Sequence, residues 1–155
     1  MKFVGRANEI KEIEKCVQSD RSHFLAIYGR RRVGKTFLVR QYLKDNLVFD
    51  ISGRKDGSKK QQISNFFAEY LTRTQGQKET LMPDSWQEAF RYLAQFLSEL
   101  PETTTKHVVF LDEMPWLDTP KSEFIGALEF FLEPTRFAYG QCVADCLWLG
   151  FVLDS

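Results

Sequence analysis

One segment constrains this chain more than any other: residues 29–36, which read GRRRVGKT. The segment fits the pattern G-x-x-x-x-G-K-[ST] of a loop that wraps phosphate groups. Gly29 and Gly34 allow the backbone to turn sharply and to approach a phosphate without an intervening Cβ atom. The N–H groups of such a loop point inward at the start of a helix, whose dipole also favours negative charge. The sequence therefore predicts a binding site for the phosphates of a nucleoside triphosphate.

The side chains of this loop have separate predicted roles. Lys35 is expected to bring its positive charge to the β- and γ-phosphates and to take part in catalysis, and the Thr36 hydroxyl to bind Mg²⁺. The residues expected to contact the nucleotide, besides Lys35 and Thr36, are Gly29, Arg30, Arg31, Arg32, Val33, Gly34 and Phe37. The three consecutive arginines are interpreted as phosphate surroundings rather than as a DNA-binding patch. The formal net charge of +0 gives no further support for nucleic acid.

Apolar patterns on both sides of the loop supply the context that the motif requires. Residues 24–28, FLAIY, form a short apolar run typical of a buried strand, and residues 37–43 have the broad apolar face of a helix. Residues 47–51, LVFDI, predict a second strand. A strand before the loop and a helix after it make the phosphate-binding interpretation specific.

A second motif lies at residues 108–113, VVFLDE, where an apolar run ends in two carboxylates. A continuous apolar run indicates a buried parallel strand, and active groups gather at the C-terminal end of such strands. Asp112 is expected to bind Mg²⁺ through its hydration shell, and Glu113 to orient and activate the water that attacks the γ-phosphate. Many strands end in a charged turn, so it is the phosphate loop upstream that makes this motif informative.

Amphipathic patterns predict three longer helices in the rest of the chain. The first follows a cap at Ser58, and the second follows a cap at Asp84 or Ser85. The third spans residues 121–132, and the polar residues 74–83 predict an exposed connection. The positions of the third helix expected to be buried are Phe124, Ile125, Leu128 and Phe131.

Composition places the chain among proteins that fold around a core. It has 155 residues, of which 43% are hydrophobic and 27% charged, which suits one domain or part of one. Cys16, Cys142 and Cys146 provide neither a disulfide framework nor a zinc-binding spacing. No apolar run has the length of a signal-peptide core or of a membrane span. We therefore expect a cytoplasmic protein that has no contact with a membrane.

Four stretches together resemble one family. They are FVGR near the start, YGRRRVGKTFLV, the SKK that precedes a helix, and FLDEMPWLDTPKSEFIGALEFF. They resemble the prokaryotic, archaeal-type AAA-like P-loop ATPases, which belong to the class with an additional strand and a catalytic glutamate. The resemblance implies a three-layer α/β fold in which helices flank a mainly parallel sheet, with ATP and Mg²⁺ as cofactors.

The same resemblance assigns functional roles to individual residues. It implies nucleotide and Mg²⁺ binding by Lys35 and Thr36, Mg²⁺ binding by Asp112, and water activation by Glu113. Arg6 resembles the arginine of the family's N-terminal nucleotide-proximal motif. From its spacing alone, a solvated helix start at Arg6 is equally open.

The resemblance ends after about Phe131. In the family, this helix ends in Phe-Trp-Asn, and a strand reading roughly Leu-Ile-Val-Cys-Gly-Ser-Ala follows and contributes a sensor group near the γ-phosphate. We therefore expect an ATPase core at residues 1–133 and an atypical tail at residues 134–155, with the C-terminal part of the fold incomplete. Without a strand from the tail, two buried strands would each lose a hydrogen-bonding neighbour. Residues 143–152 are apolar enough to supply that strand.

A shift of the reading frame by one base recovers both missing motifs. Codons for residues 131–133 can then encode Phe-Trp-Asn, and codons for residues 145–151 can encode Ile-Val-Cys-Gly-Ser-Ala. Our hypothesis is that the tail is a frameshift product and the chain a truncated ATPase. The alternative is a genuinely divergent short variant.

Three functions remain open from the sequence. The first is Mg²⁺-dependent ATP hydrolysis by Lys35, Thr36, Asp112 and Glu113. The second is a nucleotide-binding switch without significant hydrolysis, which signals to a protein partner or to a missing C-terminal module. The third is an inactive fragment that lacks the sensor strand. Nucleic acid is not supported as a partner by this chain alone.

Overall fold

The computed structural model describes residues 11, 13–15, 18, 23–29, 35–76, 81–101, 106–132 and 146–153. The elements follow in the order β1 (His23–Gly29), α2 (Lys35–Tyr42), β2 (Leu47–Ser52), α3 (Lys59–Arg73), α4 (Trp86–Ser98), β3 (His107–Asp112), α5 (Met114–Leu117), α6 (Phe124–Leu132) and β4 (Cys146–Leu153). Strands and helices alternate along much of the chain, as the sequence predicts.

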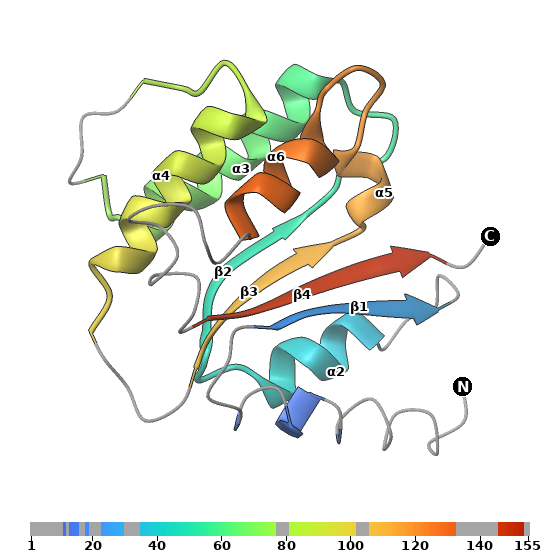
Figure 1. Ribbon diagram of the computed structural model, residues 1–155, viewed down its shortest axis with the longest axis vertical. Coiled ribbons are helices and arrows are strands. Elements are labelled where there is room, and N and C mark those ends of the chain that lie inside the picture. Colours follow the sequence, from blue (N-terminus) through green and yellow to red (C-terminus); the bar gives the residue numbers. More distant parts are fainter. Residues whose placement is uncertain are drawn as a thin grey trace.

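The four strands form one parallel sheet in the order β1-β4-β3-β2. Figure 1 shows α2 on one face of this sheet and α3, α4 and α6 on the other, so the described part has three layers. Because all strands run in the same direction, their C-terminal ends meet at one edge of the sheet. The expected three-layer α/β fold with a parallel sheet is confirmed.

The last strand in sequence occupies a central position in space. β4 pairs along its length with β1, from His23↔Leu147 to Gly29↔Leu153, and on its other side with β3. The tail therefore supplies the strand that residues 143–152 are apolar enough to form, and no gap remains between β1 and β3 in the described sheet. Both neighbours gain a backbone hydrogen-bonding partner from it.

The core lies between the sheet and the layer of α3, α4 and α6, and it is rich in aromatic rings. Phe66 of α3 lies 4.9 Å from Phe49 of β2, and Trp86 of α4 lies 4.9 Å from Phe124 of α6, measured between ring centroids. All four side chains are buried. Aromatic pairs of this kind stabilise a fold by more than the burial of their apolar area alone.

One predicted core position is wrong. Ile125 is 39% exposed, whereas Phe124, Leu128 and Phe131 are buried. These three residues are spaced by four and three positions and lie on the face of α6 that joins the core, and Ile125 lies about 100° around the helix from Phe124. The helix is also shorter than predicted, because Lys121 and Glu123 have φ values of 59° and 60° and cannot belong to a right-handed helix.

The predicted caps fix the starts of α3 and α4. The Ser58 side chain accepts a hydrogen bond from the Gln61 N–H, and the Gln61 side chain accepts one from the Ser58 N–H. Ser85 rather than Asp84 caps α4, through the Glu88 N–H. Each cap satisfies N–H groups that have no partner within the helix.

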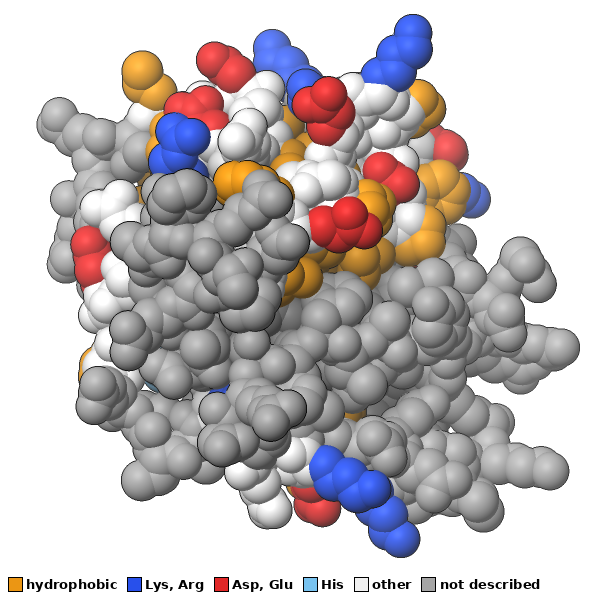
Figure 2. Space-filling view, in the orientation of Figure 1, with side chains coloured by type: hydrophobic (Ala, Val, Ile, Leu, Met, Phe, Trp, Pro, Cys, Tyr) orange, Lys and Arg blue, Asp and Glu red, His pale blue; other side chains and the backbone are white. Residues whose placement is uncertain are grey.

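The surface above α3, α4 and α6 carries charges of both signs. In Figure 2, Lys and Arg side chains alternate with Asp and Glu over this part of the molecule, and no large patch of one sign forms on the described surface in view. Among the described residues, no helix has both the length and the apolar character needed to span a membrane.

Candidate nucleotide site

Three chain segments that carry the predicted site meet at the C-terminal edge of the sheet. β1 ends at Gly29, α2 begins at Lys35, and β3 ends at Asp112. Ala26 of β1 and Leu111 of β3 are both aligned with the same residue of β4, Gly150. β1 continues for three residues beyond this level and β3 for one, and the two strands are separated by β4, which places them about 10 Å apart.

The described residues place part of the predicted phosphate loop. Gly29 is the last residue of β1, and Lys35 and Thr36 are the first residues of α2. Phe37 lies in the first turn of α2, and its side chain is 67% exposed. Arg6 and residues 30–34, which comprise Arg30, Arg31, Arg32, Val33 and Gly34, lie outside the described part of the chain.

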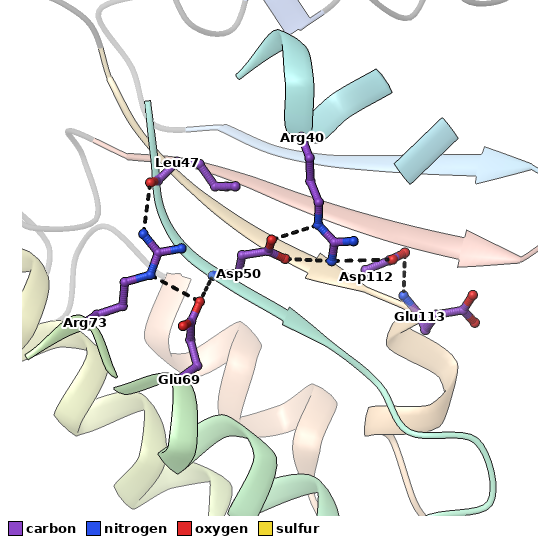
Figure 3. A network of polar contacts seen from close by, with 7 residues as sticks. All are labelled: Arg40, Leu47, Asp50, Glu69, Arg73, Asp112 and Glu113. Atoms are coloured by element: carbon purple, nitrogen blue, oxygen red, sulfur yellow. Dashed lines mark hydrogen bonds and ion pairs between the residues drawn. The ribbon is translucent and has the colours of Figure 1, made fainter. Parts of the chain in front are cut away.

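Asp112 is a buried carboxylate at the end of a buried strand. Only 6% of the residue is exposed, and the four residues that precede it are fully buried. Its Oδ1 atom accepts a hydrogen bond of 2.9 Å from the Glu113 N–H. That bond fixes the orientation of the Asp112 carboxylate relative to the turn that follows (Figure 3).

Glu113 has an unusual backbone conformation. Its φ and ψ values are 54° and 42°, in the left-handed region, and it precedes the single turn of α5. This conformation costs a residue other than glycine about 1–2 kcal/mol. Such strain at a residue with a predicted catalytic role suits a position that the surrounding structure must hold fixed.

An ion pair between Arg40 and Asp50 lies beside Asp112. Arg40 of α2 donates to both carboxylate oxygens of Asp50 in β2, with Nε–Oδ2 and Nη2–Oδ1 distances of 2.7 and 2.9 Å. Its Nη2 atom also lies 3.9 Å from Oδ2 of Asp112, and its guanidinium lies 5.5 Å from the centroid of the Phe110 ring. The hydrogen bond to Asp50 is the main reason that the pKa of Arg40 is raised above its ordinary value. Figure 3 shows Arg40 reaching both carboxylates across the face of the sheet.

The polar contacts around Asp50 extend from β2 to two side chains of α3. The Asp50 N–H donates to Oε2 of Glu69 at 2.9 Å, and the same oxygen accepts from Nε of Arg73 at 3.3 Å. Arg73 also donates to the Leu47 carbonyl. Side chains of α3 thus satisfy backbone groups at the outer edge of the sheet (Figure 3).

Arg40 and Asp50 are the site residues that the motifs did not identify. One signal for them was present, since Asp50 interrupts the apolar run at residues 47–51. A carboxylate in an otherwise apolar strand needs a partner when the strand is buried. The sequence does not identify that partner, because Arg40 belongs to another element and meets Asp50 only in the folded sheet.

The described carboxylates fit a magnesium site that is completed by a nucleotide. Mg²⁺ is commonly held by one or two carboxylates together with substrate phosphates and water. Asp112 supplies a buried carboxylate at the correct edge of the sheet. The described residues contain no cluster of three or more His, Cys, Asp or Glu side chains that could hold a metal by themselves. Thr36, the expected second ligand, is the second residue of α2, and its backbone lies at the same edge of the sheet.

Comparison with known proteins decides the family. Residues 3–144 match the ATPase domain that occurs predominantly in Archaea. The chain belongs to this ATPase family. The match extends beyond Phe131 and ends just before β4. The chain is also similar to an uncharacterized ATP-binding protein of Methanocaldococcus jannaschii, with 35% identity over 46 residues, which cover 30% of this chain and 78% of the relative.

Proposed function

We propose that this chain binds ATP and hydrolyses it in the presence of Mg²⁺. The observation that carries the proposal is the position of Asp112 and Glu113, at the C-terminal end of a buried central strand and at the same edge as the Gly29 and Lys35 backbone. Membership of the ATPase family and similarity to an ATP-binding protein support the same conclusion.

Each residue has one role in this proposal. The loop that begins at Gly29 and the side chain of Lys35 bind the phosphates of ATP, as the motif requires. Asp112 and Thr36 would hold a magnesium ion, which would supply positive charge beside the phosphates. Glu113 accepts a proton from the attacking water, or orients that water, at the γ-phosphate.

The geometry supports different roles for Asp112 and Glu113 in this proposal. The carboxylate of Asp112 is held in place by the Glu113 N–H, so its orientation is preset before a ligand arrives. The left-handed backbone at Glu113 turns the chain sharply at the end of β3, so that these neighbouring side chains do not follow the alternation of a strand. Preset groups of this kind act without reorganisation during the reaction.

ATP binding is tested by calorimetry on the whole chain and on a Lys35→Ala variant. Loss of a charge-assisted contact to the β- and γ-phosphates should weaken binding at least about tenfold, which corresponds to about 1.4 kcal/mol. Lys44→Ala, in the exposed turn after α2, is the matched control and should bind as the parent does. Equal affinities for the parent and Lys35→Ala would contradict the phosphate-loop assignment.

The same preparation separates hydrolysis from binding alone. Tight ATP binding without magnesium-dependent phosphate release would leave the nucleotide-binding switch as the function. Phosphate release that disappears when Mg²⁺ is chelated would support the ATPase.

A further inference from the structure

β2 is an edge strand of the described sheet. It is the last strand in the order β1-β4-β3-β2, so among the described residues it pairs with β3 on one side and with no strand on the other. An edge of this kind presents backbone N–H and C=O groups to which a strand of another chain can bond. An open groove of about 1030 Å³ lies along this edge, and Asp50, Ser52, Asn65 and Glu69 are among the residues that line it. The edge is therefore within reach of another molecule.

Two side chains of α3 already bond to the backbone at this edge. Nδ2 of Asn65 donates to the Ser52 carbonyl oxygen at 2.9 Å. Oε2 of Glu69 accepts from the Asp50 N–H, also at 2.9 Å. These backbone groups point away from β3, whereas the N–H of Gly53, the next residue along the chain, donates to β3. Asn65 and Glu69 thus occupy bonding positions that an added strand would use.

Arg73 extends this row by one more turn of the helix. Its Nη1 atom donates to the Leu47 carbonyl oxygen at 3.4 Å, and its Nε atom donates to Oε2 of Glu69 at 3.3 Å (Figure 3). Asn65, Glu69 and Arg73 are spaced by four positions, so they lie on one face of α3. The row therefore follows β2 from its C-terminal end back to its start.

We propose that Asn65, Glu69 and Arg73 form an edge guard that prevents β2 from pairing with a strand of a second copy of this chain. Every copy carries the same edge, so without a guard two copies could join their sheets edge to edge. An incoming strand would have to break the guard's contacts before it could bond to the same backbone groups. This inference goes beyond the proposed function and does not depend on the nucleotide.

β2 itself has two features that oppose pairing at its edge. Its pairing with β3 shifts register between Leu47 and Phe49. Asp50 places a carboxylate in the strand, where it accepts two hydrogen bonds from Arg40. Register irregularities and charged side chains are both features by which edge strands avoid pairing. The edge guard therefore agrees with the character of the strand that it covers.

A purely structural role would have a different consequence. If Asn65 and Glu69 only anchored α3 to β2, their removal would lower the unfolding midpoint and leave self-association unchanged. If they guard the edge, their removal should strengthen self-association through β2. The two roles are therefore separated by a measurement of oligomeric state rather than of stability.

The test compares the self-association of the parent with that of the double variant Asn65→Ala/Glu69→Ala, by sedimentation velocity over a range of concentrations. The double variant should self-associate at least about tenfold more tightly than the parent, because the freed edge groups can bond to a second copy. Amide hydrogen exchange in residues 47–52 of this variant should slow as its concentration rises, which would locate the contact at β2.

Two further variants serve as controls. Ser64→Ala/Thr72→Ala changes exposed residues that line the same groove and that do not bond to β2 in the described part of the chain, so it should self-associate as the parent does. Glu69→Gln keeps an oxygen that can accept from the Asp50 N–H, so it should also match the parent. Unfolding midpoints of all variants are measured in parallel.

Three results would overturn the edge guard. The first is a folded double variant that self-associates no more tightly than the parent. The second is self-association that leaves exchange in residues 47–52 unchanged, and the third is a parent whose β2 amides are already protected by self-association. If the double variant does not fold, the single variants Asn65→Ala and Glu69→Ala are judged by the same criteria. No measurement here involves ATP, so failure of the proposed function is distinguishable from failure of the guard.

Discussion

A Cβ atom at Gly53 would lie 2.3 Å from the carbonyl oxygen of Glu113, and 2.9 Å from Cβ of Trp116. The end of β2 therefore packs directly against the turn that carries the predicted catalytic glutamate. The Gly53 N–H also donates a 2.8 Å hydrogen bond to the Asp112 carbonyl oxygen. Only a residue without a side chain permits this approach.

The substitution Gly53→Ala should displace Glu113, although Gly53 is not one of the residues proposed to bind the nucleotide. An added methyl group at 2.3 Å from a backbone oxygen forces the turn to shift, and misplacement of a catalytic group lowers the chemical step more than it lowers binding. We expect phosphate release to fall at least about tenfold while ATP affinity stays within about threefold. Steady-state phosphate release and calorimetry give the two quantities.

Gly126→Ala is the control for this substitution. No atom lies within 4 Å of a Cβ placed at Gly126, which is exposed in α6, so alanine should be tolerated there and should raise helix stability slightly. Wild-type phosphate release in Gly53→Ala would contradict the inferred contact between β2 and the Glu113 turn.

Gln62 should be essential for the stability of the loop between β2 and α3. Its side chain is fully buried, accepts from the Arg54 N–H at 2.9 Å, and donates to the Arg54 carbonyl at 2.6 Å. Gln62→Ala leaves these backbone groups without their partner, which should lower the free energy of unfolding by about 1–3 kcal/mol. Urea denaturation followed by circular dichroism measures this change.

The surface position Gln95 provides the comparison. It lies exposed in α4, and Gln95→Ala should change the free energy of unfolding by less than about 0.5 kcal/mol. An effect at Gln62 no larger than that at Gln95 would show that the loop does not depend on the Gln62 amide.

Local patterns in the sequence predict most of this fold. The apolar runs give β1, β2 and β3, the spacing of buried residues gives α3 and α4, and the caps at Ser58 and Ser85 give the starts of those helices. The motif at Asp112 and Glu113 also falls at the end of a strand, as predicted. Each of these features is determined by a few residues that are neighbours in the sequence, which is why sequence patterns predict it.

Features that depend on contacts between distant segments are not predictable in the same way. The pairing of Arg40 with Asp50, the approach of Gly53 to the Glu113 turn, and the exposure of Ile125 all follow from how elements pack. The periodicity of apolar residues cannot predict such contacts, because it describes one helix or strand at a time.

β4 should be required for folding. It lies between β1 and β3 and pairs with both, so deletion of residues 146–155 would remove a hydrogen-bonding partner from each of these two strands. We expect this deletion, and the single substitution Leu149→Pro, to destabilise the chain by at least about 3 kcal/mol or to render it insoluble. Unfolding midpoints and the soluble fraction measure the effect.

The same deletion bears on the origin of the tail. A deleted chain with an unchanged midpoint would contradict the structural role of β4 and favour the hypothesis of a shifted reading frame. Loss of the fold would favour a divergent variant whose tail is part of the sheet. The nucleotide sequence across Phe131 tests the frameshift hypothesis independently.

The central claim is that this chain hydrolyses ATP with Glu113 as the group that activates water. Magnesium-dependent phosphate release by the parent and by Glu113→Gln, with ATP affinity measured on the same samples, tests it most directly. The amide keeps the size of the side chain but cannot accept a proton as a carboxylate does, so turnover should fall at least about a hundredfold with affinity retained. Equal turnover in the two proteins, or no phosphate release by a parent that binds ATP, would contradict the claim.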